Sequence, residues 1–343
     1  MFSTNNAIWM FFLILLVLVV PARSSAGELC VYVNEQGVRR EVKSLRQVPP
    51  RLRSTAQCLT AQPTTVSGSN GVSMASPKEL TLEGSLRKTT INSALGPIHL
   101  RWPRTAEEKL GKDPMRATAD AARMVSKALK QKSFPPEIRR LNLEWDVVFM
   151  DEKVPLGDVP MYLITNLHPA WMTPPANIYI VVERIASICG GDPAVCSKVA
   201  DAKMAEVLAH EMGHAIEAQI LGQVSFAGER WRAEGFATFF ERIACDYSTV
   251  IPSGAVRREH QGLAQQSFQA SPEQFTFDGS GQAYARASMY LEAVADERGI
   301  KGLMRVYDRL KGGEGSVLQA ISDETGWSQK QLEGKARALA VMP

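Results

Sequence analysis

The sequence predicts an α+β fold, in which a group of strands precedes a run of helices. Strand-like segments lie mostly before residue 183, segments with helical spacing dominate after Cys196, and no internal repeat is present. This order favours an α+β domain over a parallel-sheet fold. With 45% hydrophobic and 22% charged residues, the 343-residue chain is typical of a globular protein with a sizeable core. A formal net charge of +3 gives no electrostatic reason to expect a nucleic-acid partner.

The individual elements are predicted from the spacing of apolar residues. Strands are expected at 98–102, 143–150, 161–165 and 177–182. Helices are expected at 115–132, 198–221, 231–247, 284–298, 302–310 and 328–340. In the first of these helices, Ala119, Ala122, Val125 and Leu129 recur at helical spacing, so one of its faces is expected to be buried.

Residues 1–26 are interpreted as a secretory signal peptide. The apolar run at 7–20 has 14 residues, fewer than the roughly 20 that a helix needs to cross a bilayer. Residues 24–26 (SSA) then form a small-residue cleavage signal. We therefore expect a secreted or periplasmic protein with no integral membrane domain beyond this leader. An uncleaved membrane anchor is the alternative.

The remaining chain is predicted to contain a small module at 27–60, a flexible linker at 61–80 and a main domain at 81–343. Strands at 29–33 and 38–42 would form a β-hairpin in the module. The linker is rich in Thr, Ser, Gln and Gly. The module weakly resembles the short modules at the start of some bacterial envelope proteins, which implies an association with the cell envelope.

The five cysteines allow two local disulfide bonds in an oxidising compartment. Cys30 with Cys58, and Cys189 with Cys196, are the expected pairs, because each bond would close a loop within one region. Cys245 lies in a predicted helix and is expected to be a buried free thiol.

His210 and His214 stand four residues apart in the predicted helix at 198–221, and Glu211 follows the first of them. Two histidines at this spacing project from one helix face, a single turn apart, so both imidazoles can reach one ion. Glu211 lies about 100° further around the helix, where it can hold a water molecule without being a ligand. Zinc suits such a site, because it accepts imidazole and carboxylate ligands and leaves one position for water.

A third protein ligand is expected on the next helix. Ile220 stands where the longer motif of the metzincins has its third histidine, so that arrangement is excluded. Glu234 lies 20 residues after His214, near the start of an otherwise apolar helix. An acidic side chain there needs a partner, and a zinc ion would provide one. The alternative is a helix-terminal acid that only complements the helix dipole.

The pattern His210-Glu211-x-x-His214, followed by residues 231–237 (WRAEGFA), resembles the gluzincins, which are thermolysin-type zinc metallopeptidases. The resemblance is greatest to their aminopeptidase-N branch. It implies a zincin-like domain with a small N-terminal sheet lobe and a helical C-terminal lobe, acting on a peptide or protein substrate. It also implies one zinc ion per chain, held by His210, His214 and Glu234, with Glu211 as the general base.

The same resemblance suggests roles for further residues. Glu241 is expected to orient a zinc ligand without touching the ion, and the alternative is an exposed helix acid. Tyr284 is the expected donor to the oxyanion of the transition state, with Tyr290 as the second candidate. Either tyrosine could instead belong to the core.

The strand at 177–182 is expected to be the sheet edge that pairs with an extended substrate, through Asn177, Tyr179 and Val181.

Two departures from the family pattern are visible. Nineteen residues separate His214 from Glu234, one more than the aminopeptidases usually have, and a loop at 222–229 can absorb the difference. The Gly-x-Met-Glu-Asn segment, by which those enzymes hold the amino group of a substrate, is missing. The sequence therefore predicts zinc-assisted hydrolysis of peptide bonds without specifying an aminopeptidase. The alternatives are a non-catalytic zinc-containing envelope protein and a zinc hydrolase of a non-peptide amide or ester.

Overall fold

The computed structural model describes residues 28–33, 39–42, 45–47, 57–60, 86–131, 133–152, 168–222, 229–271, 277–311 and 315–341. The chain divides into two units, Met1–Ala75 and Ser76–Pro343. The predicted signal peptide, the predicted linker and the strand predicted at 161–165 lie outside the described residues.

The first unit contains a three-stranded antiparallel sheet with the order β2-β1-β3. Its elements are β1 (Glu28–Val33), β2 (Arg39–Val42), the 3-10 helix η1 (Leu45–Gln47) and β3 (Gln57–Thr60). The predicted hairpin is confirmed as β1 and β2. Strand β3 was not predicted, because four residues are too few to show a strand pattern. The register of β1 and β3 places Cys30 opposite Cys58, and the disulfide bond between them stays a prediction.

The second unit is built on a five-stranded mixed sheet with the order β4-β5-β6-β8-β7. Its strands are β4 (Leu86–Ser93), β5 (Gly96–Pro103), β6 (Trp145–Met150), β7 (Ala170–Thr173) and β8 (Asn177–Val181). The two outer pairs are antiparallel, whereas β5, β6 and β8 run parallel. The chain thus combines α and β structure as predicted, but its central strands are parallel. Helices between β5 and β6 form the crossover connection that parallel pairing requires.

The strand predicted to be the substrate-binding edge lies inside the sheet. β8 pairs with β6 on one side and with β7 on the other, so the backbones of Asn177, Tyr179 and Val181 already face neighbouring strands. The prediction for these three residues is wrong. The apolar run of β8 reflects a strand buried within the sheet, and β7 is the outer strand on this side among the described residues.

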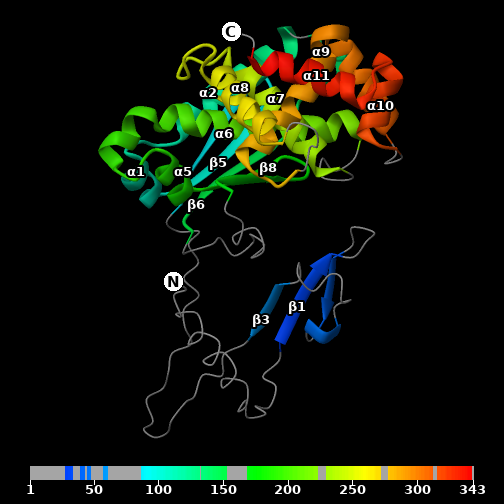
Figure 1. The fold of residues 1–343 in the computed structure, drawn as a ribbon. Coiled ribbons are helices and arrows are strands. Elements are labelled where there is room, and N and C mark those ends of the chain that lie inside the picture. Colours follow the sequence, from blue (N-terminus) through cyan, green and yellow to red (C-terminus); the bar gives the residue numbers. More distant parts are fainter. Residues whose placement is uncertain are drawn as a thin grey trace, which may run out of the picture. The chain divides into compact units, whose positions relative to one another are not determined.

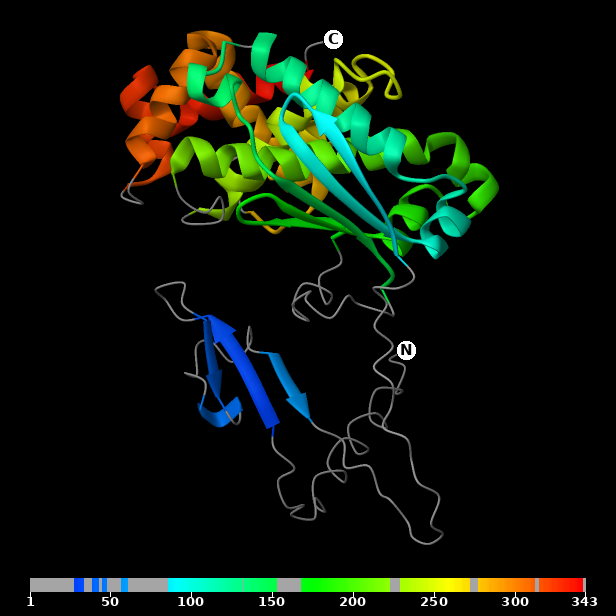
Figure 2. The ribbon, with the colours of Figure 1, turned by 180° about the vertical axis from the view of Figure 1, so that it is seen from behind.

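Helices gather on one side of the five-stranded sheet in both ribbon views (Figures 1 and 2). Alternate residues of β6 belong to different hydrophobic clusters. Val147 and Phe149 pack in the large core that includes the helices, whereas Val148 and Met150 belong to a smaller cluster. Because successive side chains of a strand point to opposite faces, the smaller cluster lies on the face away from the helices.

The helices of the second unit are α1 (Arg104–Leu110), α2 (Met115–Gln131), α3 (Pro136–Arg139), α5 (Val182–Ile188), α6 (Pro193–Leu221), α7 (Arg230–Cys245), α8 (Ala255–Ala270), α9 (Gly281–Leu310), α10 (Val317–Thr325) and α11 (Gln329–Val341). α2, α6, α7 and α11 confirm four predicted helices. The two helices predicted at 284–298 and 302–310 are confirmed as the two parts of α9, which are separated by a kink at Gly299 with non-helical dihedral angles (φ 67°, ψ 172°). No helix among the described residues is long and apolar enough to cross a membrane.

Helices α1, α3, α5, α8 and α10 are additional to the predicted set. α8 buries only a narrow stripe of side chains at every fourth position, namely Val256, His260, Ala264 and Phe268. The other positions of α8 are mostly polar, so the sequence carries a weak helical signal there.

Helix α6 begins and ends at recognisable signals. The Asp192 side chain caps its first turn by accepting a hydrogen bond from the backbone N–H of Ala194 at 2.8 Å. Pro193 takes the first helical position, where its fixed φ is favourable. Gly222 ends the helix in the left-handed conformation, with φ 67°. These signals define the helix that carries the two predicted histidine ligands.

Glu217 joins three helices at the centre of this unit. Its Oε1 accepts hydrogen bonds from Arg232 Nε on α7 at 3.0 Å and from the Tyr307 hydroxyl on α9 at 2.8 Å. All three side chains are buried. Because a buried and satisfied polar network allows few alternative packings, these bonds fix α6 against α7 and α9.

Two glycines let the same helices approach closely. A β-carbon on Gly213 of α6 would lie 3.0 Å from Ala237 Cα on α7. A β-carbon on Gly235 of α7 would lie 3.0 Å from both Cβ and the carbonyl carbon of Ala287 on α9. Both distances are shorter than ordinary van der Waals contact, so larger residues would push the helices apart.

We expect Gly235→Ala to lower the free energy of unfolding by about 1–3 kcal/mol, because the added methyl group has to displace backbone atoms of α9. Gly262→Ala on α8 is the matched control, since nothing lies within 4 Å of its added β-carbon. Alanine should stabilise that helix by up to about 1 kcal/mol. Urea unfolding of both variants measures the difference, and equal effects would contradict the close packing of α7 on α9.

The predicted disulfide bond between Cys189 and Cys196 is not formed. Both residues are buried free thiols, and so is Cys245, as predicted for that residue. Burial, together with a hydrogen bond to Cys189, raises the pKa of Cys196 to about 12. A thiol held in its protonated form is a poor nucleophile for disulfide exchange.

Candidate metal centre

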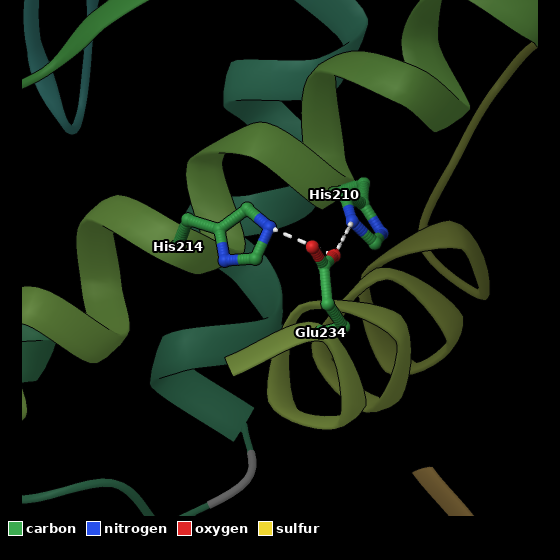
Figure 3. A group of neighbouring side chains, drawn as sticks. All are labelled: His210, His214 and Glu234. Atoms are coloured by element: carbon green, nitrogen blue, oxygen red, sulfur yellow. Dashed lines mark ion pairs between the residues drawn. The ribbon is translucent and has the colours of Figure 1, made fainter. Parts of the chain in front are cut away.

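The imidazoles of His210 and His214 and the carboxylate of Glu234 converge on one point. Figure 3 shows the two histidines on one helix, α6, with Glu234 reaching between them from α7. Each histidine Nε2 lies 3.4 Å from Oε2 of Glu234, and the three nearest ligand atoms lie within 4.8 Å of one another. The structure therefore brings together the three residues predicted as metal ligands.

The charges of this cluster favour a cation. Burial would raise the pKa of Glu234, but hydrogen bonds from His210 and His214 hold it well below its usual range. Burial would lower the pKa of His210, but Glu234 and Glu241 together raise it well above its usual range. An ionised carboxylate thus stabilises positive charge on the His210 imidazole, and a divalent cation can take the place of the bound proton.

Glu211 lies beside the cluster and lines the same cavity. Its side chain is buried, and its Oε2 has no hydrogen-bond partner among the described residues. Burial raises the pKa of Glu211, although the imidazoles of His214 and His210 oppose the shift. A buried carboxylate oxygen without a partner, facing a cavity, is placed to accept a proton from a molecule bound there.

Glu241 contacts the other nitrogen of a predicted ligand. Its Oε2 lies 2.9 Å from His210 Nδ1, and its Oε1 lies 3.6 Å from His260 Nε2 on α8. Burial would raise the pKa of Glu241, but the facing imidazoles of His260 and His210 lower it. The side chain is buried, so the alternative of an exposed helix acid is wrong. A carboxylate that accepts from Nδ1–H fixes the ring and leaves Nε2 for a metal ion.

We expect Glu241→Gln to weaken zinc binding by about 10–100-fold, because the amide cannot supply the negative charge that orients and polarises His210. Glu259→Gln is the control, since Glu259 is an exposed glutamate on α8 and does not line the cavity. Competition with a fluorescent zinc chelator measures both affinities. Equal affinities for the two variants would show that Glu241 does not support the site.

The cluster opens into a cavity of about 550 Å³. Val207 and the residues of strand β7 contribute mostly apolar side chains to its lining, whereas Glu206, Tyr284, Arg230 and His168 contribute polar ones. The Tyr284 ring lies nearly parallel to the ring of His210, with 6.2 Å between centroids and 8° between planes. Burial raises the pKa of Tyr284 above its usual range. Its hydroxyl therefore keeps its proton and can donate a hydrogen bond into the cavity.

Tyr290, the second candidate for the oxyanion donor, does not line this cavity. Its hydroxyl donates to Glu333 and accepts a hydrogen bond from Arg286 Nε at 3.0 Å. The residue is 4% exposed. Tyr290 is therefore a core tyrosine, and the structure leaves Tyr284 as the one of the two that faces the candidate site.

Several described residues of the site region were not indicated by the sequence pattern, and three of them surround Tyr284. Arg230 and His168 line the cavity, and the Phe277 ring stacks on Tyr284 with 5.4 Å between centroids. Arg230 precedes Glu234 by one helical turn, so its place on the same helix face could have been inferred. His168 and Phe277 lie outside any periodic segment, and only the tertiary fold brings them to the site.

No family model matches the chain, and no curated protein sequence matches it. Some solved structures resemble its fold. Legionella pneumophila aminopeptidase A in complex with aspartic acid is 13% identical, with 73% of this chain and 28% of that chain covered and a TM-score of 0.41. The M1 zinc metallopeptidase of Deinococcus radiodurans is 14% identical, with coverages of 75% and 52% and a TM-score of 0.37. A mutant of that protein bound to a Tyr-ser-ala substrate gives a TM-score of 0.40.

The chain thus spans about a quarter to a half of the lengths of these proteins. Their names describe peptidases, two of them zinc metallopeptidases. At this degree of similarity, they establish neither the family nor the activity of this chain.

Proposed function

We propose that this protein is a zinc-dependent peptidase of the gluzincin type, with the sheet and the following helices as its two lobes. The observation that carries the proposal is the convergence of His210, His214 and Glu234 beside the unpartnered carboxylate oxygen of Glu211. Two imidazoles and one carboxylate are a donor set that catalytic zinc sites use, and the cavity leaves room for water and substrate.

The donor atoms fit one divalent cation per chain. His210 and His214 would hold it through Nε2, and Glu234 would hold it through a carboxylate oxygen. A zinc ion bound there would polarise a carbonyl group and lower the pKa of a coordinated water from about 15.7 toward 7.

The other residues of the site would position the substrate and move the proton. Glu211 would accept the proton of the attacking water and deliver it to the leaving nitrogen. Tyr284 would donate a hydrogen bond to the oxyanion that develops on the carbonyl oxygen. Strand β7, the outer strand of the described sheet, supplies part of the cavity wall and could pair with an extended peptide.

Zinc-loaded protein incubated with a fluorogenic peptide library tests this function. We expect hydrolysis that stops when a chelator removes zinc and returns when zinc is restored. A protein that binds zinc and hydrolyses no peptide would favour a non-catalytic envelope protein. Hydrolysis of amide or ester substrates alone would favour a non-peptide hydrolase.

The proposal also includes the location expected from residues 1–26, which is secretion or export to the periplasm with an envelope association. Cell fractionation, with sequencing of the N-terminus of the recovered protein, tests this part. A chain recovered from the cytosol with its leader intact would contradict export.

A further inference from the structure

Arg230 places a positive charge in the cavity that the proposed catalysis does not use. It is the first residue of α7, and no other Lys or Arg is among the described residues that line the cavity. Its side chain is 56% exposed, so a bound molecule can reach the guanidinium group.

The contacts of Arg230 hold this charge close to the metal ligands. Its Nε lies 3.5 Å from Glu234 Oε1, and its Nη2 lies 3.4 Å from both the Tyr284 hydroxyl and His168 Nε2. The guanidinium carbon lies 5.8 Å from the centre of the Phe277 ring. These are long distances for hydrogen bonds, so the surrounding groups position the guanidinium without saturating its donors.

Glu234, which balances the charge of Arg230 here, is a proposed metal ligand. A bound cation would compete for its carboxylate, and the guanidinium would then be available to another anion. The other charged residues in the described lining are glutamates (Glu206, Glu211, Glu234 and Glu241), so Arg230 is the group there that can pair with an anion. A planar guanidinium fork matches a carboxylate with two parallel hydrogen bonds.

We infer that Arg230 selects peptides that carry a carboxylate group next to the cleaved bond. The group is an acidic side chain or the free C-terminus of a short peptide, since both present the same chemistry. This inference rests on the proposed peptidase function. Arg230 is a specificity residue in this view, whereas Glu211 and Tyr284 act on the cleaved bond itself.

Matched peptide pairs test the inference by binding and by hydrolysis. One pair has Glu or Gln beside the cleaved bond, and the other ends in a free carboxylate or an amide. Binding is measured by fluorescence anisotropy on the zinc-loaded Glu211→Gln variant, which is not expected to hydrolyse the peptides. We expect at least one acidic peptide to bind about tenfold more tightly than its neutral partner, and the preferred pair identifies the source of the carboxylate.

Adding Arg230→Gln should reduce this ratio of affinities to about one, whereas adding Arg258→Gln, an exposed arginine of α8 outside the cavity, should preserve it. In hydrolysis by the otherwise unmodified enzyme, Arg230→Gln should lower kcat/KM for the acidic peptide about tenfold more than kcat/KM for its neutral partner, mainly through a higher KM.

Three results would overturn the inference. The first is hydrolysis and binding that do not depend on substrate charge. The second is a charge preference that persists in Arg230→Gln. The third is loss of zinc from Arg230→Gln while the ratio of affinities for the acidic and the neutral peptide stays unchanged. The last result would make Arg230 a positioning residue for Glu234. Failure to hydrolyse any peptide would instead refute the proposed function, and the anisotropy ratio would still report on carboxylate recognition.

Discussion

Replacing Glu211 with glutamine is expected to reduce peptide hydrolysis by about 10²–10⁴-fold while zinc stays bound. Glutamine keeps the shape of the side chain but cannot accept the proton of the attacking water. The Glu211 carboxylate is not one of the three groups that converge as metal ligands. The zinc content of the variant should therefore remain one ion per chain. Steady-state kinetics with a cleaved peptide, together with metal analysis after dialysis, measures both quantities.

The control for this variant is Glu108→Gln, because Glu108 is an exposed glutamate on α1. Its kcat should equal that of the unmodified protein. Undiminished hydrolysis by Glu211→Gln would show that Glu211 is not the general base. Loss of zinc from this variant would show that Glu211 belongs to the coordination sphere.

Replacing Glu234 with glutamine is expected to abolish both tight zinc binding and hydrolysis. The carboxylate is the only charged member of the donor set, and its neutral amide would coordinate zinc poorly. The loss of zinc affinity should exceed the roughly 10–100-fold expected for Glu241→Gln, because Glu234 would touch the ion and Glu241 would not. Chelator competition on both variants gives the ranking directly.

The order of the two losses of zinc affinity identifies which glutamate binds the ion. A Glu234→Gln variant that retains one zinc ion with unchanged affinity would contradict its role as a ligand. A greater loss of zinc affinity in Glu241→Gln than in Glu234→Gln would indicate that the ion lies on the other side of His210, between that histidine and Glu241.

The metal cluster was the most predictable part of the molecule. His210 and His214 are related by a single helical turn, and helix geometry alone places them on one face. Glu234 lies on the next helix along the chain, which packs against the first through Gly213 and Ala237. Local periodicity therefore indicated the two histidines, and the resemblance to the gluzincins favoured Glu234 as the third ligand over a helix-terminal acid.

The substrate side of the site depended on long-range pairing and was predicted poorly. The apolar run at 177–181 correctly indicated a strand, but nothing local distinguishes an inner strand from an edge strand. The four-residue β7 carries too short a pattern to be recognised, although it forms the cavity wall. Register and strand order are set by pairing across the sheet, so they are absent from any single segment.

The cysteines illustrate a similar limit. The turn-rich segment between Cys189 and Cys196 suggested a closed loop, and the two residues do approach each other. The structure nevertheless has both as buried free thiols, and short-range sequence spacing reports neither their burial nor their bonding state.

Anomalous X-ray diffraction at the zinc absorption edge, from crystals grown with zinc, tests the central claim most directly. We predict one strong peak per chain, within about 2.0–2.2 Å of Nε2 of His210, Nε2 of His214 and a carboxylate oxygen of Glu234. A peak that contacts only one of these side chains, or its absence from the cluster at full zinc loading, would contradict the account.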